Sequence, residues 1–395
     1  MRFSETIRNM TGGGSDGWDV VRKAARMERE GTPVTHLTLG EHDIRTDPMI
    51  LEAMYRSAMD GATGYMSFEG DMGLRSRIAA RLTARTGVET TPENVLIVPG
   101  GQGGLFATHH AVCDPGDRAL YIDPYYTTYP GTIRTVGAVP VAIEARADRN
   151  FQPDEADIAA VAEGARSILV NTPNNPTGVV YTRDTLEGIG RVARDNDLWI
   201  ISDEVYDTQV WIGDHVSLRA LPGLAERTLV VGSMSKSHAM TGSRVGWVVG
   251  PEEAIHHMTN LATNTTYGVP GYIQHAAAFA LDQGEAFEEK IAEPFRRRRD
   301  LVAKLMEGQN AARAIPADGA MYVMVDIRAT GLSGEDFANR LLDEHHVAVM
   351  PGESFGKAAA GHLRVALTVA DERLEEAVAR LIELANDLAA GRQAS

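Results

Sequence analysis

The chain has 395 residues, of which 44% are hydrophobic and 23% are charged. These ordinary globular values exclude collagen-like, coiled-coil and wholly disordered chains, and the length predicts two or three domains. The 38 basic and 54 acidic side chains give a net charge of −16, which disfavours nucleic acid as a partner.

The middle of the chain alternates short β-branched runs with longer helical patterns, which predicts a mostly parallel sheet covered by helices. Helical spacing of apolar residues predicts helices at 154–164 and 183–195. We expect seven strands, at 95–98, 119–122, 139–143, 168–171, 198–201, 228–231 and 246–249.

The last part of the chain differs, because a long charged helical pattern begins at residue 285. Strands are expected around 321–325 and 362–367, a closing helix at 371–389, and an additional edge strand from residues 34–39. We therefore predict an α/β fold, with a large seven-stranded domain and a smaller α+β domain built from both chain ends. The expected parts are an N-terminal arm and part of the small domain (1–45), the large domain (46–284), and an interdomain helix with the C-terminal small domain (285–395).

Other features indicate the cellular setting. A single cysteine, Cys113, cannot form an intramolecular disulfide, which favours a reducing compartment. The N-terminus lacks a signal-peptide pattern, and no segment reaches the roughly 18 apolar residues that span a bilayer. We therefore expect a cytoplasmic protein with no membrane partner.

Three conspicuous stretches predict no chemistry. The glycine-rich stretch at 11–17 has no strand before it, so we interpret it as a flexible N-terminal arm. The arginine run at 296–299 is interpreted as the charged face of a long helix. Adjacent histidine pairs face different sides of a helix, so no metal site is predicted.

Two glycine- and hydroxyl-rich turns could bind an anion. Residues 99–106 follow a predicted strand and open a helix, where backbone N–H groups can face a phosphate, although the stretch matches no standard nucleotide motif. In residues 232–246, Lys236 lies just beyond an apolar strand, between two serines, and Arg244 follows eight positions later. This pattern fits a desolvated amine beside a phosphate-binding cluster.

A third stretch, at 200–206, places Asp203 at the carboxyl end of another apolar strand and Tyr206 three residues further on. Ligands of open α/β sheets collect at these strand ends. An acid, a phenol, a lysine and anion-binding groups match the ring nitrogen, phenolic oxygen, aldehyde and phosphate of pyridoxal phosphate. The residues therefore predict pyridoxal 5′-phosphate as the cofactor.

The motifs resemble those of the class I/II aminotransferases, which are fold-type I pyridoxal-phosphate enzymes. The resemblance rests on Asn-Asn-Pro-Thr-Gly at 174–178, Ser-Asp-Glu-Val-Tyr at 202–206, and Ser-Met-Ser-Lys at 233–236 with Arg244. Further matches at 39–41, 64–75, 114–117 and 362–365 extend it over nearly the whole chain.

The resemblance implies a role for each matching residue. Lys236 would bind the cofactor covalently and move a proton, Asp203 would pair with the ring nitrogen, and Tyr206 would bond the phenolic oxygen. Arg364 would bind the substrate α-carboxylate. The other implied contacts are Gly101, Gln102, Ser233, Ser235 and Arg244 for the phosphate, Tyr65 reaching it from the partner subunit of a homodimer, Tyr126 stacking on the ring, Asn175 on both cofactor and substrate, and Gly40 near the substrate.

The implied reaction transfers an amino group from an L-amino acid to a 2-oxo acid by a ping-pong mechanism. Stretches at 235–251, 323–333 and 359–362 resemble the arginine–pyruvate transaminase branch. An aspartate or broad-specificity aminotransferase and a C–S lyase stay open, because one cofactor site permits several outcomes. Gln102 stands where many aspartate-using relatives have lysine, and His42 and Ile44 replace the family's usual proline and aromatic residue. Four acids near the expected substrate entrance favour a neutral or cationic side chain, namely Glu41, Asp43, Glu69 and Asp71.

Overall fold

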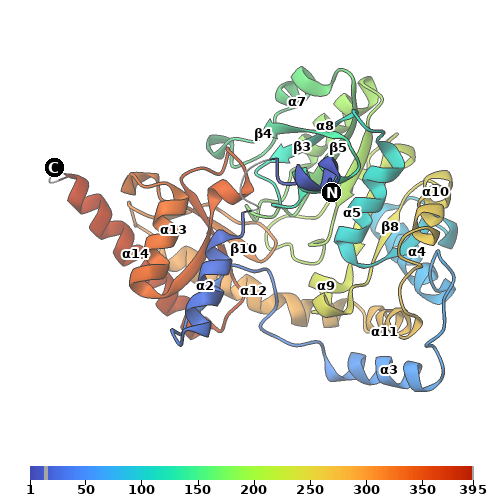
Figure 1. Cartoon of the computed structure of the whole chain (residues 1–395), viewed down its shortest axis with the longest axis horizontal. Helices are drawn as coiled ribbons and strands as arrows, with labels where there is room; N and C mark the ends of the chain where they lie inside the picture. The colour runs from blue at the N-terminus through green and yellow to red at the C-terminus, as the bar shows by residue number, and fades with distance from the viewer. Residues whose placement is uncertain (13–16, 394–395) are drawn as a thin grey trace.

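The computed structural model describes residues 1–12 and 17–393, so part of the predicted arm at 11–17, residues 13–16, lies outside the described residues. Figure 1 shows the middle of the chain on one side, and the C-terminal α13 (Gly334–His345) and α14 (Asp371–Gln393) on the other, beside the N-terminal α2 (Asp19–Arg29). The two chain ends thus meet in one part of the molecule.

The larger sheet has seven strands in the order β2-β8-β7-β6-β5-β3-β4. Strand β8 is antiparallel to both of its neighbours, and the other pairs are parallel. All seven predicted strands and the mostly parallel arrangement are confirmed. Their bounds are β2 (Val95–Val98), β3 (Arg118–Asp123), β4 (Val139–Glu144), β5 (Ala165–Asn171), β6 (Trp199–Asp203), β7 (Thr228–Ser233) and β8 (Gly246–Val249).

Helices cover this sheet because their apolar residues recur at helical spacing. In the helix spanning Arg183–Asp195, for example, Leu186, Ile189 and Val192 are buried in one core cluster with β5 and β6. The two helices predicted here are confirmed. The bounds are α3 (Pro48–Met59), α4 (Met72–Thr86), α5 (Gly100–Val112), α6 (Tyr129–Thr135), α7 (Glu155–Ala162), α8 (Arg183–Asp195), α9 (Met234–Ser237), α10 (Glu252–Thr263) and α11 (Gly271–Leu281), with the short α1 (Glu5–Arg8) near the start of the chain.

The second sheet has five strands in the order β1-β11-β12-β10-β9. The N-terminal β1 pairs in parallel with β11 and forms one edge, so the predicted edge strand from the start of the chain is confirmed. Strands β9 and β11 were not predicted. The bounds are β1 (Thr35–Leu37), β9 (Arg313–Ala314), β10 (Tyr322–Asp326), β11 (Val347–Pro351) and β12 (His362–Ala366).

The long helix α12 (Glu285–Leu305) runs from α9, beside the large sheet, to α14 in the part of the molecule where the chain ends meet (Figure 1). Its arginine run is not simply a solvated face, because Arg298 is buried. The Arg298 guanidinium is 2.6 Å from the carboxylate of Asp43 and 3.0 Å from that of Asp371. Helix α12 thereby ties the segment after β1 to the start of α14. Within residues 1–12 and 17–393, no helix is both long and apolar enough to cross a membrane.

Candidate active site

A cavity of about 380 Å³ lies at the carboxyl ends of β6 and β7 and is closed on the other side by the second sheet and the segment after β1. Parallel strands place their carboxyl ends at one edge of a sheet, which is where ligands of such folds bind. The cavity brings together most of the predicted site residues: Gly40, Gly101, Gln102, Tyr126, Asn175, Asp203, Tyr206, Ser233, Ser235, Lys236, Arg244 and Arg364.

Lys236 lies on α9, one short turn beyond β7, and its side chain extends into the cavity. Its ammonium group donates to the backbone carbonyl of Gly40. Burial lowers the pKa of Lys236, because a charged amine loses its hydration there. The structure therefore holds an amine that is easier to deprotonate than a surface lysine.

Asp203 ends β6 and is buried at the floor of the cavity. Its carboxylate accepts a hydrogen bond of 2.6 Å from the hydroxyl of Tyr129. Burial raises the pKa of Asp203 to about 6 and outweighs the opposing effect of this hydrogen bond. A cationic ring nitrogen near the carboxylate would stabilise its ionised form.

The hydroxyl of Tyr206 lies 2.9 Å from that of Tyr322, and both side chains are buried. Tyr322 comes from β10 of the second sheet and also lines the cavity. Sequence reasoning missed Tyr322, because it lies in an apolar strand that is explained equally well by the core. The one signal in the sequence that could have indicated a site residue was a tyrosine, with its polar hydroxyl, in an otherwise aliphatic strand.

Arg364 on β12 is only 1% exposed, although its guanidinium lines the cavity. The guanidinium lies 4.4 Å from the ring centres of both Tyr322 and Phe355. It donates to the side-chain oxygen of Asn175 at 2.9 Å and to the backbone carbonyl of Thr38. These two bonds use two of its five N–H donors, and its buried Nε has no hydrogen-bond partner among the described residues, so donors remain for a ligand.

The start of α5 and the residues around Lys236 form an anion-binding corner. Gly100 has a φ of +75°, which favours glycine, and a Cβ atom there would lie 2.5 Å from the guanidinium of Arg244, so glycine lets this side chain approach the backbone. The hydroxyl of Ser233 donates to that of Ser235 at 2.9 Å. Backbone N–H groups at a helix start, two hydroxyls and a guanidinium are a typical phosphate site.

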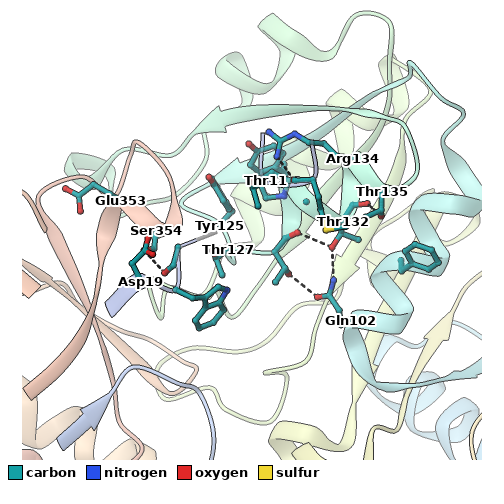
Figure 2. A pocket seen from close by; sticks show the side chains of 18 of the residues that line it. Thr11, Asp19, Gln102, Tyr125, Thr127, Thr132, Arg134, Thr135, Glu353 and Ser354 are labelled. Carbon is teal, nitrogen blue, oxygen red and sulfur yellow. Dashed lines mark hydrogen bonds between the residues drawn. The ribbon is translucent and has the colours of Figure 1, made fainter. Parts of the chain in front are cut away.

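Gln102 lies between this corner and a larger neighbouring cavity of about 850 Å³. Figure 2 shows its side chain directed toward Thr132 of α6, to which its amide donates at 2.7 Å. Its amide oxygen accepts from Thr128 at 3.0 Å. The side chain of Gln102 is thus engaged by α6, which leaves its backbone for the anion-binding corner.

One predicted residue is not brought to the cavity of its own chain. Tyr65 is 87% exposed, and its ring contacts that of Tyr267 at a centroid distance of 5.6 Å. Tyr126, by contrast, lies in the cavity with its ring edge-to-face against Tyr129.

His42 is a functional candidate whose role the sequence did not predict. Its Nε2 lies 2.9 Å from the backbone carbonyl of Lys236, so this nitrogen carries the proton. Its ring packs edge-on against Phe295. Burial lowers the pKa of His42 to about 4, and the charge of Lys236 acts in the same direction.

The fold agrees with the comparisons to known proteins. Residues 32–381 match the family model described as aminotransferase class I and II. The chain belongs to this family and is a transferase, which confirms the predicted fold class and the predicted aminotransferase activity.

Individual relatives match over almost the whole chain. The arginine–pyruvate transaminase AruH of Pseudomonas aeruginosa is 40% identical over 98% of this chain and 99% of its own length. The aspartate/prephenate aminotransferase of Thermus thermophilus is 36% identical over 91% of this chain and 92% of its own. The solved aspartate aminotransferase from Thermus thermophilus with maleate has a TM-score of 0.91 at 33% identity, covering 97% of this chain and 100% of that one.

Proposed function

We propose that this aminotransferase uses pyridoxal 5′-phosphate and transfers an amino group from an L-amino acid to a 2-oxo acid. The observation that carries the proposal is one cavity that holds a partly buried lysine together with a buried carboxylate, a buried phenol and a buried arginine: Lys236, Asp203, Tyr206 and Arg364. These groups are complementary to the cofactor's reactive positions and to a substrate carboxylate.

The residues fit the proposed cofactor by the chemistry of their donors and acceptors. The glycine start of α5, with Ser233, Ser235 and Arg244, supplies the donors that a phosphate needs. Asp203 supplies a buried acceptor for a protonated ring nitrogen. When bound, pyridoxal phosphate contributes an aldehyde carbon that reacts with amines and a ring that stabilises negative charge at the substrate α-carbon.

The chain's own groups then have separate tasks. Lys236 would hold the cofactor and, once free, would take the proton from the substrate α-carbon and return it to the carbon on the other side of the amino nitrogen, the cofactor's former aldehyde carbon. Its lowered pKa supports this task, because a neutral amine is the effective base. Asp203 holds the proton on the ring nitrogen. Tyr206 and Asn175 would donate to the phenolic oxygen, and the ring of Tyr126 would stack on the cofactor.

The opposite end of the cavity binds the substrate carboxylate. Arg364 presents a planar guanidinium that two aromatic rings and Asn175 hold in one orientation, which suits a bidentate carboxylate. Gly40 lies beside it, where a Cβ atom would come 1.8 Å from the hydroxyl of Tyr322. This end therefore recognises the part that all amino acid and 2-oxo acid substrates share.

For the amino donor, we propose arginine, with pyruvate as the acceptor. The identity to the arginine–pyruvate transaminase supports this choice. Of the four predicted acids, Glu41 lines the cavity, where it accepts a 3.2 Å hydrogen bond from Thr241. Asp43 is paired with Arg298, and Asp71 caps α4. Because both carboxylates already have partners in this chain, they give less support to a cationic substrate side chain than Glu41 does. Aspartate stays the alternative, because other relatives are named for it.

We also propose a cytoplasmic homodimer in which Tyr65 completes the phosphate site of the partner. Large apolar side chains are exposed on α3 and nearby, and such a patch is typical of a protein–protein interface. These side chains are Met49, Leu51, Tyr55, Met59, Tyr65, Met72 and Tyr267. Tyr65 lies within the patch, as a residue that reaches across an interface would.

The test is a set of half-reactions with the purified, cofactor-loaded protein. Arginine, lysine, alanine, phenylalanine, glutamate and aspartate are added singly, and the loss of the bound cofactor's absorbance is followed. We expect arginine to react fastest. If aspartate or glutamate reacts fastest, the donor proposal is wrong but the cofactor proposal stands. If borohydride reduction labels a lysine other than Lys236, the proposed site itself is wrong.

A further inference from the structure

Tyr322 connects the two ends of the cavity. Its hydroxyl lies 2.9 Å from that of Tyr206, and its ring covers the guanidinium of Arg364 at 4.4 Å. It is 2% exposed, and the absence of a side chain on Gly40 makes room for its hydroxyl. No other described residue bonds the Tyr206 hydroxyl.

The direction of the bond between the two phenols follows from proton counting. Each hydroxyl has one proton to donate. If Tyr206 gives its proton to the phenolic oxygen of the cofactor, as proposed above, its oxygen can only accept from Tyr322. Tyr322 must then be the donor. In a water-poor cavity, donors in series polarise one another, so Tyr206 becomes a stronger donor.

We propose that Tyr322 is a positioning residue for Tyr206: its hydroxyl donates to Tyr206 and strengthens the hydrogen bond that Tyr206 makes to the cofactor's phenolic oxygen. This inference rests on the proposed function of the site. A stronger bond to that oxygen stabilises its negative charge. It therefore lowers the pH at which the bound cofactor loses its proton, which keeps the site reactive toward incoming amines near neutral pH.

The ring of Tyr322 has a separate task, which the substitutions can separate from that of the hydroxyl. Tyr322→Phe removes the hydroxyl and keeps the ring over Arg364. Tyr322→Leu removes both. We expect the KM for the amino acid to stay within about twofold in Tyr322→Phe and to rise roughly tenfold in Tyr322→Leu, because only the second variant uncovers Arg364.

The decisive measurement is the pH midpoint of the bound cofactor's absorbance change. It is determined for the wild type, Tyr206→Phe, Tyr322→Phe and the double variant. One neutral hydrogen bond is worth up to about a tenfold change in equilibrium, so Tyr322→Phe should raise the midpoint by about half to one pH unit. Tyr206→Phe should raise it further. The double variant should match Tyr206→Phe, because Tyr322 acts only through Tyr206.

The matched control is Tyr181→Phe, which removes a buried phenol hydroxyl outside the cavity. Its midpoint should equal that of the wild type, and its unfolding temperature shows what the loss of a buried hydroxyl alone does. A midpoint unchanged in Tyr322→Phe would overturn the inference, and so would additive shifts in the double variant. A wild-type midpoint in Tyr206→Phe would overturn the proposed role of Tyr206 itself, and the inference with it.

Discussion

The large sheet and the segment after β1, residues 38–46, meet at the cavity but contribute different groups. The sheet presents side chains from its strand ends and from the turns that directly follow them, such as Asp203 at the end of β6 and Lys236 just after β7. The segment presents mainly its backbone, because the carbonyl of Gly40 accepts from Lys236 and that of Thr38 accepts from Arg364. The reacting side chains therefore belong to the rigid large sheet, and the backbone of residues 38–46, the crossing segment, holds these side chains in place.

The largest effect should come from the sheet. Lys236→Ala removes the group that moves the proton, and positioned proton transfer contributes up to about 10⁴-fold in rate. We expect the half-reaction with an amino acid to slow by roughly that factor, measured in a single turnover. The control is Lys290→Ala, which removes an exposed lysine of α12 and should react like the wild type. A Lys236→Ala rate within tenfold of the wild type would contradict the assignment of the chemistry to the large-sheet side of the cavity.

The second sheet residue should have a smaller but still large effect. Asp203→Asn keeps the side chain's shape and removes the charge that holds the ring nitrogen protonated, so we expect kcat/KM to fall roughly 10²- to 10³-fold. Glu204→Gln is the matched control. Glu204 is the next residue and is also buried, but it bonds Ser202, Ser217 and His215 away from the cavity. Equal losses of kcat/KM in the two variants would mean that Asp203, like Glu204, matters only as a buried charge that supports folding, and not through the ring nitrogen.

The first test of the crossing segment is Gly40→Ala. The added Cβ would lie 1.8 Å from the Tyr322 hydroxyl, so one of the two must move. Such overpacking costs about 1–3 kcal/mol, and we expect the KM for the amino acid to rise roughly tenfold while the cofactor stays bound. In the control, Gly391→Ala, the new Cβ meets nothing within 4 Å. Unchanged substrate kinetics in Gly40→Ala would show that the segment has room to shift.

The smallest effect concerns stability and involves His42. Its folded-state pKa is lowered to about 4 by burial, below an ordinary value of 6.5. The unfolded chain therefore takes up a proton first, and the stability contributed by neutral His42 is complete above pH 6.5 and is lost as the pH falls toward 4. Between pH 7 and 5 this amounts to about 2 kcal/mol at most.

Urea unfolding of the wild type and of His42→Gln at pH 7 and pH 5 measures this contribution. We expect the variant to lose less stability between the two pH values than the wild type does. Because glutamine can keep a donor toward the Lys236 carbonyl, the comparison isolates the titration. Equal losses in both proteins would show that folding does not lower the pKa of His42, against the expected direction.

The large sheet could be predicted because each of its strands is a short apolar run bounded by turn residues. In the second sheet, β1, β10 and β12 were expected but β9 and β11 were not. Strand β9 has only two residues, too few for any period to appear. Strand β11 is a continuous apolar run, and periodicity alone does not separate such a run from a buried helix.

The sequence predicted those site residues that belong to a recognisable motif at the end of a strand. Lys236, Asp203 and Arg364 follow or lie in recognisable strands, and the structure brings them to one cavity. Tyr322 and His42 could not be assigned in this way. In the sequence, Tyr322 is indistinguishable from a core residue of an apolar strand. The hydrogen-bond partner of His42 is the backbone carbonyl of Lys236, a residue 194 positions away.

By itself, the sequence determined the type of fold, the family and the chemical groups of the site, because hydrophobic period, strand-end position and motif order are local properties of the chain. Only the tertiary structure decided which groups meet. It placed the Tyr322 hydroxyl against Tyr206, the Thr38 carbonyl against Arg364, and Arg298 against Asp43. These contacts join segments that are more than 100 residues apart, and they form because α12 connects the two parts of the molecule and residues of both sheets line the same cavity.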